Sequence, residues 1–417
     1  MKSRRVVVTG IGALTPIGNN LQDYWKALQD GVSGAAPITH FNAENFKTQF
    51  ACEVKGFEVT DFIHRKEARK LDKFSQYAMV VADEAFTDSG LNVDKIDSDR
   101  AGVIWGSGIG GMQTFYNESV NFGSGNGMPR FNPFFIPKLI SDIPAGHISI
   151  KYNFRGPNFT TVSACASSTN ALIDAFNYIK WNKADIFIAG GSEACVYEPG
   201  IGGFNAMMAL STRNDDPKTA SRPFDKDRDG FVMGEGGGAL VIEEYEHAIK
   251  RGAKIYAEIV GGGLTADAHH ITAPHPEGLG ACNVMRLAIE DAEIPVTDID
   301  YINVHGTSTP LGDIAETKAI KTLFGDHAYK LNISSTKSMT GHLLGAAGII
   351  ESIACVMAVK DDVVPPTINH KTDDPNIDNK LNLTFNKAQK RTVNYALTNT
   401  FGFGGHNASV LFKKYTS

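Results

Sequence analysis

The sequence has few cysteines, and no two of them have metal-binding or redox spacing. Its 417 residues include five cysteines, at positions 52, 165, 195, 282 and 355, and none belongs to a C-x-x-C motif. An odd number without a regular framework argues against structural disulfides and favours a reducing, cytoplasmic setting. No run of about 18 apolar residues exists, so no membrane-spanning helix is expected. Gly10 and Gly12 interrupt the N-terminal apolar run, which favours a first strand over a signal peptide.

Several motifs of common enzyme classes are also missing. The absence of a Walker A loop, of G-x-S-x-G and of H-E-x-x-H argues against P-loop nucleotide hydrolases, α/β-hydrolases and zinc peptidases. The segment 106–111 matches G-x-G-x-x-G, but no acidic residue falls about 20 positions later, so nicotinamide binding is not expected. Ser334 and Lys337 satisfy S-x-x-K without the companion motifs of penicillin-binding proteins.

Acidic residues outnumber basic ones overall, but one short segment is strongly basic. The chain has a formal net charge of −6, which gives no general attraction for nucleic acid. Against that background, residues 65–70 read Arg-Lys-Glu-Ala-Arg-Lys. Apolar residues recur after them at helical spacing, so we expect a helix over 66–88 with the basic cluster on its first turns. The cluster is either an ordinary solvated face or a docking patch for an acidic partner.

Apolar strand-like runs alternate with helical patterns along the chain. Strands are expected at 5–9, 102–106, 159–162, 186–189 and 239–243, and helices at 21–30, 66–88, 111–121 and 167–181. After Arg251-Gly252 the alternation restarts, with strands expected at 255–260, 299–304, 330–333, 395–398 and 408–412, and helices at 279–292, 312–324 and 343–359. The pattern predicts an α/β protein with a mostly parallel sheet covered on both faces, in two related halves. Long loops are expected at 124–135 and 208–228, where they would cover a site or contact a partner. For the second loop, a purely structural connection is the alternative.

Cys165 lies where a short apolar run gives way to small residues and then to a helical pattern. The segment 162–168 reads Val-Ser-Ala-Cys-Ala-Ser-Ser. A thiol at a helix N-terminus meets unpaired N–H groups and the positive end of the helix dipole, which stabilise a thiolate. Most single cysteines are small buried hydrophobes, but these small neighbours fill a core poorly and leave room for an electrophile. We therefore interpret Cys165 as a candidate nucleophile.

Two histidines follow predicted strands and precede predicted helices. His305 opens His-Gly-Thr-Ser-Thr-Pro at 305–310, and His342 ends Lys-Ser-Met-Thr-Gly-His at 337–342. Side chains at strand ends in an open α/β sheet face a cleft more often than a core. One imidazole can polarise a carbonyl as a donor while the other assists proton transfer.

Polar residues lie near both histidines, and the two threonines after His305 have two interpretations. The hydroxyls of Thr307 and Thr309 would bind an amide-rich or phosphate-bearing ligand arm, or would only cap the next helix. Lys337 and Glu351 would form a buried pair that keeps the electric field at the second histidine steady.

A glycine-dense turn follows the strand predicted at 395–398. Residues 399–407 read Asn-Thr-Phe-Gly-Phe-Gly-Gly-His-Asn. Glycines let the backbone approach a ligand, so an N–H here would serve an oxyanion hole together with the N–H of Cys165. The aromatic ring between glycines is also free to swing. A plain tight turn is the alternative.

These segments together resemble those of the elongating β-ketoacyl-acyl-carrier-protein synthases, type II, of bacterial fatty acid synthesis. The resemblance runs nearly end to end and rests on Cys165 and on segments 305–309, 337–342 and 402–405 in that order. The Cys-His-His set separates the chain from initiating synthases, which use Cys-His-Asn, and from thiolases, which use a second cysteine. The resemblance implies a thiolase-like α/β fold in α-β-α-β-α layers, usually a homodimer. Its two duplicated halves would be 1–252, with the nucleophile and the carrier-docking helix, and 253–417, with both histidines and the glycine-rich gate.

The resemblance also implies an activity, the decarboxylating Claisen condensation of acyl-carrier-protein with malonyl-carrier-protein through an acyl-Cys165 intermediate. His305 and His342 would stabilise the enolate, and the N–H groups of Cys165 and Phe403 would form the oxyanion hole, with Phe403 as a gate. No metal or redox cofactor, nucleic acid or membrane is implied, because phosphopantetheine arrives on the carrier protein. The other implied positions are Lys337 and Glu351 in support of the histidines, Thr307, Thr309, Thr272, Ile109, Gly402 and Gly404 at the substrate, and Lys66, Arg69 and Lys70 for docking of the carrier protein.

One departure and two alternatives accompany this resemblance. His406 stands where the family more commonly has threonine, and it adds a titratable group beside the proposed gate. A ketosynthase of a polyketide or aryl-polyene pathway is one alternative. A non-catalytic chain-length-factor subunit is the other; such subunits generally lack the nucleophile, so Cys165 with both histidines argues against it.

Overall fold

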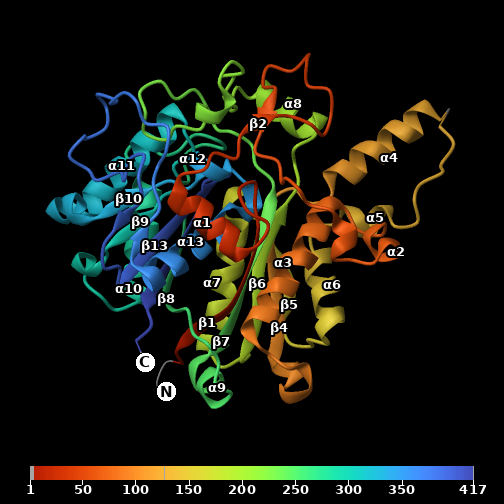
Figure 1. Cartoon of the computed structure of the whole chain (residues 1–417), viewed down its shortest axis with the longest axis horizontal. Coiled ribbons are helices and arrows are strands. Elements are labelled where there is room, and N and C mark those ends of the chain that lie inside the picture. Colours follow the sequence, from red (N-terminus) through yellow and green to blue (C-terminus); the bar gives the residue numbers. More distant parts are fainter. Residues whose placement is uncertain (1–3, 126, 417) are drawn as a thin grey trace.

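The computed structural model describes residues 4–125 and 127–416. Within these ranges ten strands form one sheet, in the order β10-β9-β13-β14-β8-β1-β7-β6-β4-β5 (Figure 1). The strands of the first half are β1 (Val6–Leu14), β4 (Ala101–Gly106), β5 (Asn158–Thr161), β6 (Ile186–Glu193) and β7 (Gly236–Glu244). Those of the second half are β8 (Ala257–Ala266), β9 (Tyr301–Asn303), β10 (Asn332–Ser334), β13 (Tyr395–Gly402) and β14 (His406–Lys414). Four short strands form two further ladders, β2 (Ala36–Pro37) with β3 (Phe50–Ala51) and β11 (Val363–Val364) with β12 (Gln389–Lys390).

The two halves of the sheet repeat one pairing pattern. From β1 outward, β1–β7 and β7–β6 are antiparallel, whereas β6–β4 and β4–β5 are parallel. From β8 outward the order is the same, since β8–β14 and β14–β13 are antiparallel and β13–β9 and β9–β10 are parallel. The halves join through the antiparallel β1–β8 pair. The prediction of a mostly parallel sheet is wrong, because the last strand of each half inserts antiparallel between the first strand and the parallel ones.

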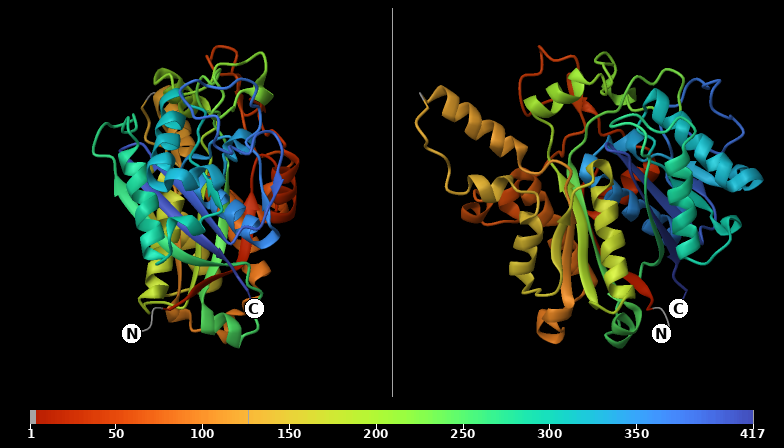
Figure 2. Two further views of the ribbon diagram at one scale, coloured as in Figure 1. Left: turned by 90° about the vertical axis from the view of Figure 1, so that its left-hand side faces the viewer. Right: turned by 180° about the vertical axis from the view of Figure 1, so that it is seen from behind.

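Helices form three layers around the strands. In the middle layer, α7 (Ser167–Lys180) and α13 (Ala347–Asp361) contact each other and strands of both halves. The strands of the first half are covered outside by α3 (Lys73–Ser89) and α6 (Ile143–Tyr152), and those of the second half by α10 (Leu279–Asp291) and α11 (Pro310–Phe324) (Figure 2). The other helices are α1 (Leu21–Asp30), α2 (Arg65–Ala68), α4 (Met112–Ser124), α5 (Phe135–Leu139), α8 (Glu198–Ala206), α9 (Tyr245–Lys250) and α12 (Lys337–Thr340). Among the helices of the described ranges, none combines the length and hydrophobicity that a bilayer crossing requires.

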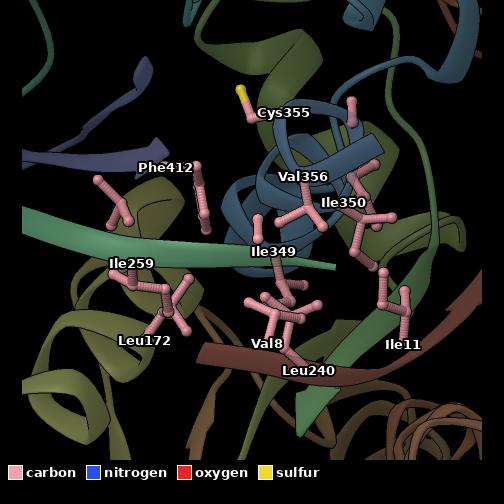
Figure 3. Packing of buried hydrophobic residues seen from close by; sticks show 14 of the residues in the cluster. Val8, Ile11, Leu172, Leu240, Ile259, Ile349, Ile350, Cys355, Val356 and Phe412 are labelled. Carbon is pink, nitrogen blue, oxygen red and sulfur yellow. The ribbon is translucent and has the colours of Figure 1, made fainter. Parts of the chain in front are cut away.

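The middle helix α13 has no polar face. Every residue from Ala347 to Val359 is buried, as expected for a helix between two layers of strands. A Cβ atom at Gly238 of β7 would lie only 2.9 Å from Cδ1 of Ile353, so glycine permits this close approach of helix and strand. Figure 3 shows side chains of α13 packed with strand residues, among them Ile349, Ile350, Val356, Val8, Ile11 and Leu240.

The helix predicted over 66–88 is in fact two helices. The turn between α2 and α3 contains Asp72, whose carboxylate accepts the N–H of Phe74 and so caps α3. The same carboxylate accepts the backbone N–H of Thr114 at the start of α4. The basic cluster therefore lies on α2 and the following turn, not on the first turns of the long helix.

The residues described between α4 and α5, which are 125 and 127–134, form neither helix nor strand, in agreement with the loop predicted over 124–135 except at its two ends. Asn126, within this loop, lies outside the described residues. The arm formed by α4 and residues 127–134 projects from the body of the molecule (Figures 1 and 2). α6, which precedes β5, was not predicted, because its apolar residues lack a regular helical period.

The burial of α13 predicts unequal effects of one substitution at two isoleucines. Ile353→Ala is expected to lower the free energy of unfolding by about 2 to 5 kcal/mol, because it leaves a cavity between helix and strand. Ile249→Ala, at a side chain with 43% exposure, is expected to change it by about 0.5 kcal/mol or less. Urea unfolding followed by circular dichroism measures both, and equal losses would contradict the middle-layer position of α13.

Candidate active site

The N-terminal ends of α7 and α13 meet at the candidate site. Each helix follows a 3₁₀ turn, Ala164–Ala166 in one case and Leu344–Ala346 in the other, and the two turns contact each other. Both turns begin with a non-glycine residue in the left-handed region, Ala164 at φ 51° and Leu344 at φ 49°. Such backbone is strained and persists only where the surrounding structure holds it. The two halves therefore present the same tight turn to each other; one turn contains Cys165, and the other begins two residues after His342.

Cys165 and the two predicted histidines form one cluster. Nε2 of His342 lies 3.0 Å from Sγ of Cys165, a hydrogen-bond contact. The rings of His305 and His342 have centroids 5.3 Å apart and planes at 87°. The ring centroids of Phe401 and His305 are 5.5 Å apart. Those of Phe231 and His342 are 5.3 Å apart, and these two rings form a T-shaped pair. The three groups are buried, so their chemistry takes place away from bulk water.

A cavity of about 640 Å³ opens onto this cluster. Most of the predicted substrate positions line it, together with the cluster itself: Ile109, Cys165, Thr272, His305, Thr307, Thr309, His342, Gly402 and Phe403. Gly404 is not part of the lining; its N–H donates to the carbonyl oxygen of Ile271 at 2.6 Å. The hydroxyls of Thr307 and Thr309 lie 3.0 Å apart, side by side in the cavity wall.

Both imidazoles are neutral at ordinary pH. Burial lowers the pKa of His305 and of His342 well below the usual value, and the nearby ammonium of Lys337 lowers both further. Lys337 is itself buried and forms a hydrogen-bonded ion pair with Glu351 behind the cavity. A neutral imidazole has one N–H donor and one lone pair, so each ring is able to polarise a carbonyl oxygen or to accept a proton.

The thiol of Cys165 is protonated in the resting site. Burial raises its pKa to about 12, although the charge of Lys337 and a hydrogen bond from the backbone of Phe403 act in the opposite direction. The stabilised thiolate expected from the sequence is therefore outweighed by desolvation. Ionisation of this thiol has to be coupled to the arrival of a substrate or to proton transfer to His342.

The glycine-rich turn lies directly against the nucleophile. A Cβ atom at Gly402 would lie 2.7 Å from the carbonyl oxygen of Ser163 and 3.1 Å from the backbone N of Cys165, so this approach requires glycine. The ring centroids of Phe403 and Phe204 are 6.3 Å apart, and the two ring planes are tilted by 42°. His406 is exposed, and its ring lies over Gly404, where a Cβ atom would be 2.8 Å from Nε2.

Glu316 belongs to the site but was not predicted. Its carboxylate accepts the backbone N–H groups of His305 and Gly306, each at 2.9 Å, and the side-chain amide of Asn399 at 3.2 Å. Burial raises its pKa to about 7. Glu316 holds the turn that carries His305. The sequence gives no signal for it, because it lies within an ordinary helical pattern eleven residues after the histidine.

The three predicted docking residues lie outside the cavity lining, on α2 and the next turn. Lys66 and Arg69 are exposed, and neither forms an ion pair with any residue in 4–125 or 127–416. Lys70 is partly buried and pairs with Glu67 at 2.8 Å. Two of the three predicted docking residues are therefore exposed cations without an ion-pair partner among the described residues. In the described part of the chain, no group of three or more His, Cys, Asp or Glu side chains is arranged to hold a metal ion.

Comparison with known proteins identifies relatives over the whole chain. Residues 3–248 match the beta-ketoacyl synthase N-terminal domain, and residues 256–371 match the beta-ketoacyl synthase C-terminal domain. The 3-oxoacyl-[acyl-carrier-protein] synthase 2 of Synechocystis sp. is 48% identical over 415 residues, which cover 100% of this chain and 99% of the relative. The protein of the same name from Staphylococcus aureus strain COL is 50% identical over 414 residues, 99% of each chain.

A solved structure extends the likeness to three dimensions. It is a complex of a type II PKS acyl-carrier protein with its ketosynthase bound to the hexaketide. The matched chain of that complex superposes with a TM-score of 0.92 and is 32% identical in sequence. The match covers 99% of this chain and 100% of that one. The ketosynthase likeness confirms the predicted thiolase-like α/β fold. The chain belongs to the beta-ketoacyl synthase family.

Proposed function

We propose that this protein is an elongating 3-oxoacyl-acyl-carrier-protein synthase of fatty acid synthesis, with Cys165 as its nucleophile. The observation that carries the proposal is the contact of Sγ of Cys165 with Nε2 of His342 at a cavity also lined by His305. A soft sulfur nucleophile exchanges readily with thioesters. The names of relatives at about half identity over the full chain support the fatty acid pathway.

In the first step, Sγ of Cys165 attacks the carbonyl carbon of an acyl thioester carried by acyl carrier protein. The new C–S bond forms as the bond to the carrier sulfur breaks, and the thiol proton passes by way of Nε2 of His342 to the departing carrier thiolate. The tetrahedral oxyanion accepts hydrogen bonds from the N–H groups of Cys165 and Phe403. The closeness of Gly402 to the backbone of Cys165 supports this pairing of donors.

In the second step, a malonyl thioester replaces the carrier thiol. Neutral His305 donates a hydrogen bond to its thioester carbonyl oxygen, and His342 does the same in the tautomer that carries its proton on Nε2, which it adopts once the thiol is acylated. Cleavage of the C–CO₂ bond then releases carbon dioxide and leaves an enolate. The enolate carbon attacks the acyl-Cys165 carbonyl and expels the thiolate of Cys165, which takes a proton from solvent. Lys337 and Glu351 lie behind the histidines, and burial together with the charge of Lys337 lowers the pKa of both imidazoles and keeps them neutral. No step requires a metal or redox cofactor.

The substrate would reach the thiol along the cavity wall. Thr272, Thr307 and Thr309 would contact the phosphopantetheine arm, and Ile109 would border the acyl chain. Gly402 and Gly404 would shape the turn around the Phe403 gate. We assign the nucleophile to a half comprising 1–252 and the histidines to a half comprising 253–417, so each half supplies part of the site.

Lys66, Arg69 and Lys70 would receive the acidic carrier protein, whose complex with a related ketosynthase supports such a partnership. We also infer a homodimer in the cytoplasm. Apolar side chains stay exposed on the arm and beside the edge strand β5, and a second copy would cover them. They are Phe115, Val120, Phe122, Met128, Phe131, Phe134, Ile136 and Val162.

The nucleophile assignment predicts a covalent intermediate. Incubation with acyl carrier protein charged with a saturated acyl group is expected to add the acyl mass to the protein, as read by intact-protein mass spectrometry. Cys165→Ala is expected to abolish the addition. Cys282→Ala removes a more exposed thiol and is expected to leave it unchanged. Acylation that persists in Cys165→Ala would remove Cys165 from the mechanism.

The buried thiol predicts a particular pH dependence. Because the pKa of Cys165 is raised from 9.0 to about 12, the thiolate fraction keeps growing as pH rises past 9. The rate of alkylation of Cys165 by iodoacetamide is therefore expected to increase with pH without levelling off near 9. A plateau at or below pH 8 would show that the helix end and His342 stabilise the thiolate more strongly than burial opposes it.

The docking patch predicts a salt-dependent loss of carrier binding. Lys66→Glu combined with Arg69→Glu is expected to weaken affinity for acyl carrier protein by about tenfold at low salt. The loss is expected to shrink at high salt, where screening shortens the reach of the charges. Lys26→Glu with Arg286→Glu changes two exposed cations elsewhere and serves as the control in surface plasmon resonance. Equal losses for the two pairs would leave the patch an ordinary solvated face.

A further inference from the structure

Glu193 is a fully buried carboxylate beside the site that the proposed mechanism does not use. It is the last residue of β6 and has no exposed surface. No lysine or arginine among residues 4–125 and 127–416 pairs with it. Its two oxygens instead accept hydrogen bonds at 2.8 to 3.2 Å from five donors, namely Oγ of Ser107 and the backbone N–H groups of Gly108, Ile109, Gly110 and Gly345.

These donors belong to two separate segments. Oε1 accepts from Ile109 and Gly110 in the loop after β4, whereas Oε2 accepts from Gly108 of that loop and from Gly345 in the turn before α13. A Cβ atom at Gly345 would lie 2.2 Å from the backbone N of Gly108 and 2.6 Å from Oε2. The two segments are therefore in direct contact, and the carboxylate holds them together by accepting hydrogen bonds from both.

Each of the two segments bound to Glu193 supplies an apolar wall of the cavity. Ile109 lies in the first segment and Leu344 in the second, directly before Gly345, and both line the cavity that contains Cys165. They pack in the same apolar cluster with Phe231. The second segment also follows His342 by three residues. The separation of the two walls, and their position relative to the imidazole, therefore depend on the bonds to Glu193.

We propose that Glu193 is a positioning residue that sets the width of the acyl end of the cavity and thereby the chain lengths that the site accepts. The inference rests on the proposed function, since it assumes that an acyl chain attached to Cys165 lies between Ile109 and Leu344. A carboxylate suits this place because it accepts on both oxygens without any donor of its own. Buried backbone N–H groups left without an acceptor are costly, so the two segments cannot relax independently.

Glu193→Gln tests the proposal with almost no change of volume. The amide NH₂ group has to face either the donors at Oε1 or those at Oε2, and it repels one segment. We expect the ratio of kcat/KM for long to short saturated acyl thioesters to change by about tenfold, equivalent to about 1.4 kcal/mol in relative transition-state stabilisation. The measurement is steady-state condensation across a series of acyl lengths, together with the melting temperature of each variant.

Glu243→Gln is the matched control. Glu243 on β7 is equally buried. In the strand register it stands opposite Ile186, at the other end of the β6–β7 ladder, roughly 23 Å along the strand from Glu193. Its hydrogen-bond partners are Thr9, His247 and Arg251, and neither Glu243 nor any of these partners lines the cavity. The control is expected to lower the melting temperature while the parental length ratio is kept.

The outcomes separate the proposal from general destabilisation. An unchanged length ratio in Glu193→Gln, or an equal change in Glu243→Gln, would overturn it. If Glu193→Gln does not fold, Ser107→Ala decides, because it removes one donor to Oε1 and an acceptor for the N–H of Gly110. An unchanged ratio in Ser107→Ala then overturns the proposal, and a shifted ratio supports it. Failure of the parent protein to become acylated at Cys165 would instead refute the proposed function.

Discussion

Desolvation of the Cys165–His342 pair is the constraint on which the rest of the site depends. The pair lies where the ends of α7 and α13 meet, and both helices form the middle layer between the two halves. Core packing therefore fixes the position of the sulfur and the imidazole, more rigidly than exposed loops do. The same burial raises the pKa of the thiol and lowers that of the imidazole. Position and charge state thus have one physical origin.

The charge of Lys337 acts in the same sense as burial on the histidines and in the opposite sense on the thiol. It disfavours a second positive charge on His305 or His342, and it favours a negative charge on Cys165. Its pairing with Glu351 keeps this buried ammonium in place. Decarboxylation produces a negative oxygen, and neutral N–H donors beside a fixed positive charge stabilise it without protonating it.

The sequence predicted the grouping of the candidate side chains better than it predicted the direction of the strands. Strand ends followed by small residues and a nucleophile or imidazole are local signals, and the structure brings Cys165, His305 and His342 together. Strand direction is not local: β7 and β14 return last in each half and insert antiparallel, which no period within a strand reveals. The break at Asp72 was missed because the apolar spacing continues across a capping residue. Glu316 was missed because it lies within an ordinary helical pattern, and Glu193 was missed because most of its partners are backbone N–H groups of turns far away in the sequence.

A thiol with a raised pKa attacks a thioester only if its proton moves as the bond forms. At 3.0 Å, Nε2 of His342 is close enough to accept that proton. Burial and the nearby charge of Lys337 both disfavour the resulting imidazolium, so the proton does not remain on the ring. The departing carrier thiolate, which is the stronger base once the tetrahedral intermediate collapses, then takes it. In the proposed mechanism, the low pKa of His342 therefore lets the ring pass on the proton that it accepts from the thiol. The ring is then neutral for the decarboxylation that follows.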